Sequence, residues 1–261
     1  MLNKEKNAMN SIKKIAVSIS MVFALVMTLI MPMTVQAANK GPNKAAENNA
    51  YIQLITWKYD DAQESYVEVA THIWGTDEHF SHYPGAVQEN VKGFSYNASN
   101  NTLTITNYKN AGASLDINEM GDDFKIKLVG TNELQNIQVW GYMYGGSLTV
   151  TGKGKLTVNK NKNLGIPGIY LRSELSASKF VCDKNVKLTV YTSNTNTNAG
   201  SQYAILSTQN TKASGVITFK TSNKKTLNKK VKKAKKTYVD DWTGESLEVY
   251  EHSVKGNIKA K

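Results

Sequence analysis

The chain has 261 residues, of which 40% are hydrophobic and 20% are charged, with a formal net charge of +11 and a single cysteine. These values are typical of a soluble globular protein and exclude a disordered tail, a polytopic membrane protein and a small domain held together by disulfides. Because Cys182 stands alone, no intramolecular disulfide can form, and we expect this residue to be a small buried hydrophobe.

Residues 1–37 have the order of a secretory signal peptide. Four lysines precede an apolar run from Ile15 to Ile30, and Pro32 leads into the small residues of Val35-Gln36-Ala37. This order predicts a signal helix that is cleaved after Ala37. A membrane anchor is the alternative, since the run is near the lower limit for a span, but the proline and the small residues favour a leader. We therefore expect a secreted, extracellular or cell-wall-associated protein with no membrane span after cleavage.

The next segments predict a linker followed by an N-terminal β cap. Residues 38–50 are small and polar, as linkers are. Residues 51–74 form two β-rich runs joined by a polar turn, which predicts a hairpin. Residues 75–93 lack periodicity and are expected to form a long loop, so that 51–93 make up the cap and its loop.

Residues 94–222 carry short strands in which apolar and polar residues alternate, each closed by Asn, Gly, Asp or Lys. Alternation is the period of a half-buried strand, and the closing residues suit tight turns. Leu148 and Leu156 begin two such strands, and the residues between them, 151–154, are expected to form a corner.

Similar units recur along this region. Leu103, Ile126 and Leu148 begin three of them, and Ile169 and Leu188 are expected to continue the series. A step of roughly 20 to 23 residues is the length of one coil of a parallel β-solenoid. We therefore predict an all-β protein containing a short right-handed parallel β-helix, in which stacked coils bury Leu, Ile and Val and the hairpin caps the first coil. An antiparallel sandwich of short hairpins is the alternative.

The repeat also resembles a known module. Gly93–Asn97 with Asn101–Ile105, then Ile126–Asn132, then Gly146–Gly152, are similar to repeats of secreted surface proteins of Gram-positive bacteria that look like carbohydrate-binding parallel β-helices. The resemblance covers about residues 51–222. It implies a bacterial exoprotein at the cell surface that binds carbohydrate, although solenoids of this kind carry unrelated activities.

The C-terminal region begins with a lysine-rich segment. Residues 223–236 contain eight lysines and no acidic residue, and we interpret them as a linker before a β element at 237–261. The run predicts a site for an anionic wall polymer or an acidic polysaccharide, formed by Lys229, Lys230, Lys232, Lys233, Lys235 and Lys236. A solvated, flexible charge run is the alternative. Specific nucleic-acid binding is disfavoured because readers of bases rely on arginine, which the run lacks.

Three aromatic residues predict a platform for sugar rings. Trp140, Tyr142 and Tyr144 alternate along one strand face, and neighbouring glycines leave their rings unobstructed. The alternative is that these rings pack in the interior, against Trp57 or Trp74.

Signals for catalysis and for metal binding are weaker. A lyase of β-helix architecture would draw on Glu119, Asp122, Asp123 and the only arginine, Arg172, but the acids are expected to form a solvated corner. His72, His79 and His82, together with Asp77 and Glu78, could bind zinc, but their spacing matches no known metal motif. We therefore expect no cofactor and a non-catalytic polysaccharide-binding protein. A polysaccharide lyase or hydrolase, or an adhesin that binds a protein, are the alternatives.

Overall fold

A computed structural model describes residues 50–261, except for 62, 76–86, 89–90, 142–145, 175–176, 195–197, 211, 215 and 240–245. Contacts divide the chain into two units, Met1–Ala38 and Asn39–Lys261, and the fold described below is that of the second unit. The predicted signal peptide and nearly all of the predicted linker lie outside the described residues.

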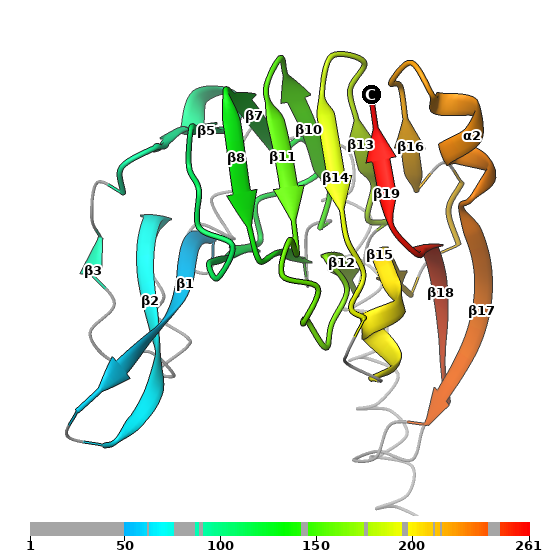
Figure 1. Cartoon of the computed structure of the whole chain (residues 1–261). Helices are drawn as coiled ribbons and strands as arrows, with labels where there is room; N and C mark the ends of the chain where they lie inside the picture. Colours follow the sequence, from blue (N-terminus) through cyan, green and yellow to red (C-terminus); the bar gives the residue numbers. More distant parts are fainter. Residues whose placement is uncertain are drawn as a thin grey trace, which may run out of the picture. The chain divides into compact units, whose positions relative to one another are not determined.

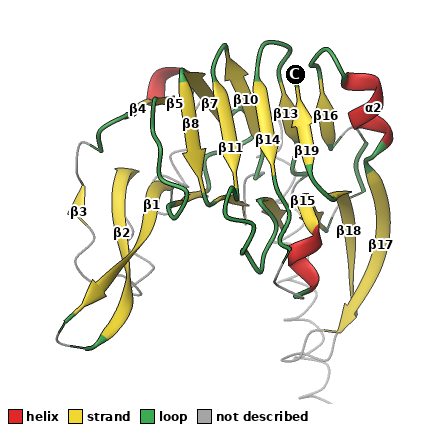
Figure 2. Ribbon diagram, viewed as in Figure 1, coloured by secondary structure: helices red, strands yellow, loops and turns green. Residues whose placement is uncertain are grey.

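The described chain is all-β, with parallel and antiparallel strands in three sheets (Figure 2). The nine-stranded sheet has the order β17 (Lys232–Val239), β18 (Ser246–Lys255), β15 (Tyr203–Gln209), β12 (Ile169–Ser173), β9 (Asn136–Gly141), β6 (Ser114–Asn118), β1 (Tyr51–Asp60), β2 (Ser65–Gly75) and β3 (Val87–Gln88). The six-stranded sheet has the order β16 (Ile217–Phe219), β13 (Phe180–Cys182), β10 (Leu148–Gly152), β7 (Lys125–Val129), β5 (Thr102–Thr106) and β4 (Phe94–Asn97). The four-stranded sheet has the order β19 (Ile258–Ala260), β14 (Lys187–Val190), β11 (Lys155–Val158) and β8 (Thr131–Leu134). The helical segments are α2 (Lys224–Lys229) and the 3₁₀ helices Ala98–Asn100 and Ala199–Gln202.

The chain visits the three sheets in a fixed order. It runs through β7, β8 and β9, then through β10, β11 and β12, then through β13, β14 and β15, and we call each of these circuits a pass. Strands β5 and β6 belong to an incomplete pass before these three, and β16 begins an incomplete pass after them. Equivalent strands of successive passes pair in parallel, so that β8, β11 and β14 lie side by side in Figure 1. The predicted corner between Leu148 and Leu156 is confirmed, because these residues lie in consecutive strands of different sheets, β10 and β11.

Alternation along the strands builds the core between the sheets. One inward row of the six-stranded sheet crosses five paired strands, and all of its side chains are buried: Leu103, Ile126, Val150, Cys182 and Phe219. The expectation that Cys182 is a buried hydrophobe is confirmed, and burial raises the pKa of its thiol to about 12. Outward neighbours in these strands are lysine and threonine, as the sequence pattern predicts.

The predicted continuation of the repeat beyond Leu148 is wrong. Leu148 lies opposite Phe180, whereas Leu188 lies opposite Leu156 in the four-stranded sheet and Ile169 belongs to the nine-stranded sheet. The error arises because strands of different sheets share one alternating pattern, each burying every second residue. Periodicity alone therefore does not assign a strand to its sheet.

The predicted N-terminal hairpin is confirmed. Strands β1 and β2 pair antiparallel from Tyr51 opposite Gly75 to Asp60 opposite Ser65. On its other side β1 pairs antiparallel with β6, which brings its buried leucine and isoleucine side chains onto the core at Leu115.

The interpretation of residues 223–236 as a linker is also wrong, because this segment is folded. Its first part forms α2, which buries Leu227, and Asn228 exchanges two hydrogen bonds with the backbone of Phe219, at 2.9 and 3.0 Å. Its second part begins β17, which pairs antiparallel with β18. Strand β18 of the C-terminal element thus orders part of a lysine-rich segment for which the sequence also allows a solvated, flexible run.

Candidate functional site

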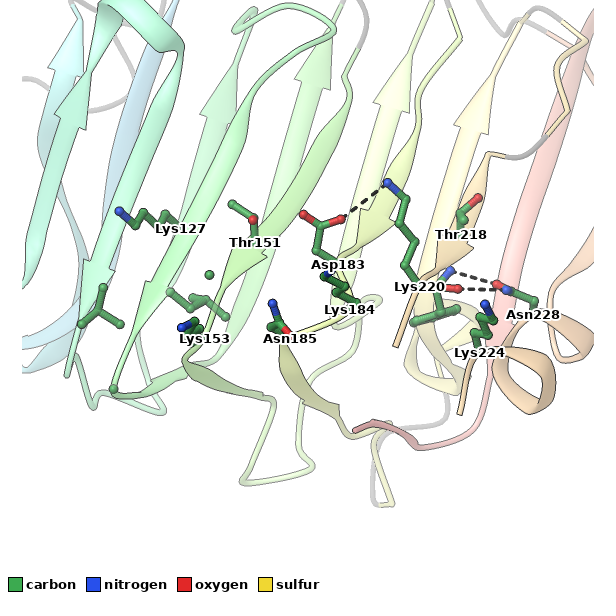
Figure 3. A pocket seen from close by; sticks show the side chains of 15 residues that line it. Lys127, Thr151, Lys153, Asp183, Lys184, Asn185, Thr218, Lys220, Lys224 and Asn228 are labelled. Carbon is green, nitrogen blue, oxygen red and sulfur yellow. Dashed lines mark hydrogen bonds and ion pairs between the residues drawn. The ribbon is translucent and has the colours of Figure 1, made fainter. Parts of the chain in front are cut away.

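A groove lies where successive passes turn from the six-stranded to the four-stranded sheet. It has a volume of about 1060 Å³ and is lined by the ends of β7, β10, β13 and β16, by the corners that follow them, and by α2 (Figure 3). We call it the corner groove. Corners of four different passes form it, so residues far apart in the sequence lie along one line.

Glycines make the groove hollow. Gly130 and Gly152 have φ angles of +66° and +98°, in the left-handed region that favours glycine. A Cβ at Gly154 would lie 2.7 Å from the carbonyl carbon of Leu128 and 2.8 Å from its Cβ, so no side chain fits there. Gly130 and Gly152, which line the groove, therefore bring no side chain into it, and Gly154 lies packed against the preceding corner.

The groove is strongly basic. Its lining contains five lysines and one carboxylate: Lys127, Lys153, Lys184, Lys220, Lys224 and Asp183. The Nζ of Lys220 lies 3.5 Å from Asp183, as Figure 3 shows, and this ion pair is exposed. The other four lysines form no ion pair with any described residue. The groove thus presents an excess of positive charge that the described residues do not neutralise.

A second hollow continues the same line of corners. It has a volume of about 730 Å³, and Lys92 and Lys109 line it together with the edge-to-face pair of Phe94 and Tyr108, whose centroids lie 4.6 Å apart. Its wall includes Asn107, whose Oδ1 accepts a hydrogen bond from the Thr131 amide at 3.2 Å, beside the corner groove. The basic surface therefore extends past the corner groove by one more pass.

The lysines predicted from sequence lie elsewhere. Lys229 is the last residue of α2 and Lys230 its C-cap, and Lys232, Lys233, Lys235 and Lys236 are exposed along β17, the edge strand of its sheet. Two of the six form ion pairs, Lys235 with Glu248 and Lys236 with Glu251, the latter at 2.8 Å. Lysines on an edge strand also hinder its pairing with other chains. Only Lys224 of the wider run reaches the corner groove.

The predicted aromatic platform is described only at Trp140, because Tyr142 and Tyr144 lie outside the described residues. The Trp140 ring is half-buried on β9, with Tyr170 edge-on at 5.9 Å and the Arg172 guanidinium 5.3 Å from the ring centroid. Trp57 is instead 57% exposed and Trp74 packs on Tyr96, so neither is seen against Trp140.

The weaker sequence candidates are dispersed. Asp122 accepts a hydrogen bond from Ser147 at 3.3 Å, Asp123 accepts one from Asn101 at 2.7 Å, and Arg172 pairs with Glu174 at 2.9 Å. Of the predicted metal candidates, His72 is buried on β2, whereas His79, His82, Asp77 and Glu78 lie outside the described residues.

Sequence reasoning missed the corner groove because its lysines are single residues on separate passes. The available signal was the recurrence of Gly or Lys within two residues of the end of each strand, at Gly130, Lys153, Lys184 and Lys220. Without the pairing of strands, these residues could not be placed beside one another.

Comparisons with known protein families, with curated proteins and with solved structures find no match, so the functional argument depends on the site itself. Within the described part of the chain, no helix has the length and apolar character needed to cross a membrane.

Proposed function

We propose that this protein is a secreted or cell-wall-associated, non-catalytic binding protein that holds an anionic polysaccharide or anionic wall polymer in its corner groove. The observation that carries the proposal is the set of five lysines against one carboxylate in a groove formed by four successive passes.

The repeat of the fold supports a polymeric ligand. Neighbouring strands in a sheet lie about 4.8 Å apart, so the corner groove follows the stack of strands for roughly 14 Å. Lys127, Lys153, Lys184 and Lys220 come from four consecutive passes, which gives one positive charge per pass. A linear chain with regularly spaced negative charges matches this arrangement better than a compact ligand does.

Energetics also favour a multivalent ligand. An exposed charge pair contributes only about 0.2–1 kcal/mol, so a single anionic group would bind weakly to any one of these lysines. Several pairs along one polymer act together, because the first contact raises the effective concentration of the next charge. Such binding is screened by salt, since all of the charges are exposed.

The finer description of the scaffold belongs to the same proposal. The fixed order of the sheets, the parallel pairing of successive passes and the hairpin at one end support a short parallel β-helix, which we take to be right-handed as such crossover connections usually are. The order of residues in 1–37 supports export.

Retention on immobilised polymers tests the proposal. The protein should be retained at low salt on a polyuronate and on a polyphosphate resin, and released by 0.5 M salt, about five times the roughly 0.1 M at which the Debye length is near 10 Å. It should pass through a neutral glucan resin. Retention on the neutral resin alone would contradict the proposal and would instead support the Trp140 platform.

A further inference from the structure

A row of three buried polar side chains crosses strands β6, β1 and β2, away from the corner groove. Gln53 lies directly opposite Asp116 on one side and opposite His72 on the other. We call these residues the Asp116 row. Residues opposite each other on neighbouring antiparallel strands share a face, with Cβ atoms about 4.5–5.5 Å apart. The three side chains therefore form a contiguous group.

The row is closed off from solvent. Asp116, Gln53 and His72 are 8%, 1% and 5% exposed. Asp116 Oδ2 accepts hydrogen bonds from the Tyr51 hydroxyl at 3.2 Å and from Gln53 Nε2 at 3.1 Å, and the Tyr51 ring lies edge-on to His72 with centroids 6.3 Å apart. Neutral donors thus hold one carboxylate oxygen, and within the described part of the chain no cationic side chain forms an ion pair with Asp116.

Each member of the row keeps one buried polar atom without a hydrogen-bond partner. These atoms are Asp116 Oδ1, Gln53 Oε1 and His72 Nδ1. An unsatisfied buried polar atom destabilises the folded protein, so three on adjacent residues call for a ligand that satisfies them together. Each of these three atoms has a lone pair that can bind a cation, and one of the atoms belongs to a carboxylate.

The backbone is also irregular at this point. The pairing of β1 with β2 shifts register between Ile52 and Gln53, directly where the row crosses β1. Such irregularities re-aim side chains and are over-represented beside functional sites.

We propose that the Asp116 row binds a divalent transition-metal ion of the zinc class through Asp116 Oδ1, Gln53 Oε1 and His72 Nδ1. A cation supplies the charge that the buried carboxylate lacks and satisfies all three atoms at once. Imidazole nitrogen together with oxygen donors suits zinc better than calcium or magnesium, which prefer oxygen alone. The ion would join the hairpin to β6, and so stabilise the N-terminal cap.

This assignment differs from the metal candidates in the sequence. It keeps His72 but joins it to residues of other strands, and among the described residues no group of three His, Cys, Asp or Glu is found. The carboxamide of Gln53 is the third donor, which a search for the usual metal-binding residue types does not include.

Metal analysis of the full chain tests the proposal. After treatment with a chelator, the protein is incubated with zinc or calcium chloride, dialysed and analysed by mass spectrometry for metal content. We expect one zinc ion per chain, no retained calcium, and a higher melting temperature with zinc. Absence of retained zinc in the folded protein would overturn the proposal and leave water as the occupant of the row.

Variants locate the ion. Asp116→Asn and His72→Phe should each weaken zinc binding at least tenfold, whereas His252→Gln, at another buried histidine, should retain it. Loss of zinc in a His79→Ala/His82→Ala variant together with retention in Asp116→Asn would overturn the assignment. If Asp116→Asn does not fold, cobalt(II) is bound to the unmodified protein and its visible absorption spectrum is recorded. We expect the absorption bands of an imidazole-bound cobalt(II) site, and their absence would contradict the proposal.

Discussion

Gly154 lies directly against Leu128 of the preceding pass, and its amide donates a hydrogen bond to the Leu128 carbonyl at 3.1 Å. This contact draws together two successive corners, whose residues Leu128, Gly130, Gly152 and Lys153 line the corner groove. The geometry of the groove therefore depends on the close packing of Gly154.

Replacing Gly154 by alanine should destabilise the protein by about 1–3 kcal/mol, the usual cost of inserting a methyl group into packed surroundings. The added Cβ would meet backbone atoms of Leu128, which cannot rotate away. Denaturation by urea measures the effect. Gly112→Ala is the matched control, since the nearest atom to its Cβ would be Asn110 Oδ1 at 3.4 Å. Equal stability of the two variants would contradict this account of the close packing at Gly154.

Asn132 should be a second point of sensitivity. Its fully buried side chain accepts a hydrogen bond from the Tyr108 amide at 2.9 Å and donates to the carbonyls of Val129 and Lys155, both at 3.2 Å. It thus connects three passes. Asn132→Ala should cost about 2–3 kcal/mol in urea denaturation, because buried backbone groups lose their partners. Asn163→Ala, at an exposed position, should change stability by less than about 0.5 kcal/mol.

His252 should make the stability depend on pH. It is buried opposite Ser207 and Lys233, neither ring nitrogen has a hydrogen-bond partner, and burial, followed by the charge of Lys233, lowers its pKa below the ordinary 6.5. As the pH falls below about 6.5, the unfolded chain takes up a proton that the folded protein does not, so stability decreases until the folded pKa is reached.

Melting temperatures between pH 8 and pH 5, measured in the presence of a chelator, test this effect. The free energy of unfolding derived from them should decrease by at most about 1.4 kcal/mol per pH unit, and this decrease should be smaller in His252→Gln. Asp116 does not explain such a loss, because burial raises its pKa and protonation at low pH favours the folded state. An unchanged slope in His252→Gln would show that another group is responsible.

Cys182 should be unreactive in the folded protein. It lies in the inward row of the six-stranded sheet, and burial raises its pKa to about 12, so almost no thiolate forms at pH 8. A colorimetric thiol reagent should label it only after unfolding by urea. Labelling within minutes under native conditions would contradict the burial of this row.

The sequence predicted the local elements better than their assembly. Thr alternating with Leu, Ile or Val indicated strands such as Thr102–Thr106 and Leu148–Gly152, and the polar turn after Asp60 indicated the hairpin, because these depend on neighbouring residues alone. The placing of Leu188 in the same series as Leu148 was wrong, since the alternation that buries one strand in a sheet also buries a strand in the next sheet.

The candidate site was harder to predict for a related reason. The lysines from 229 to 236 stand together in the sequence, yet they end on a helix and an edge strand, two of them in ion pairs. Lys127, Lys153 and Lys184 are isolated in the sequence and meet only because successive passes stack. The local density of charge in the sequence identified lysines 229–236, whereas the corner groove can be identified only when the pairing of the strands is known.

The most direct measurement compares two triple variants of equal charge for binding to a polyuronate at low salt. Lys127→Gln/Lys153→Gln/Lys184→Gln removes three lysines of the corner groove, and Lys229→Gln/Lys230→Gln/Lys232→Gln removes three exposed lysines outside it. Three contacts of about 0.2–1 kcal/mol each correspond to a loss of about threefold to 150-fold for the groove variant, whereas the other should bind within about twofold of the unmodified protein. Equal losses in both variants, or the larger loss in the second, would contradict the assignment of the ligand to the corner groove.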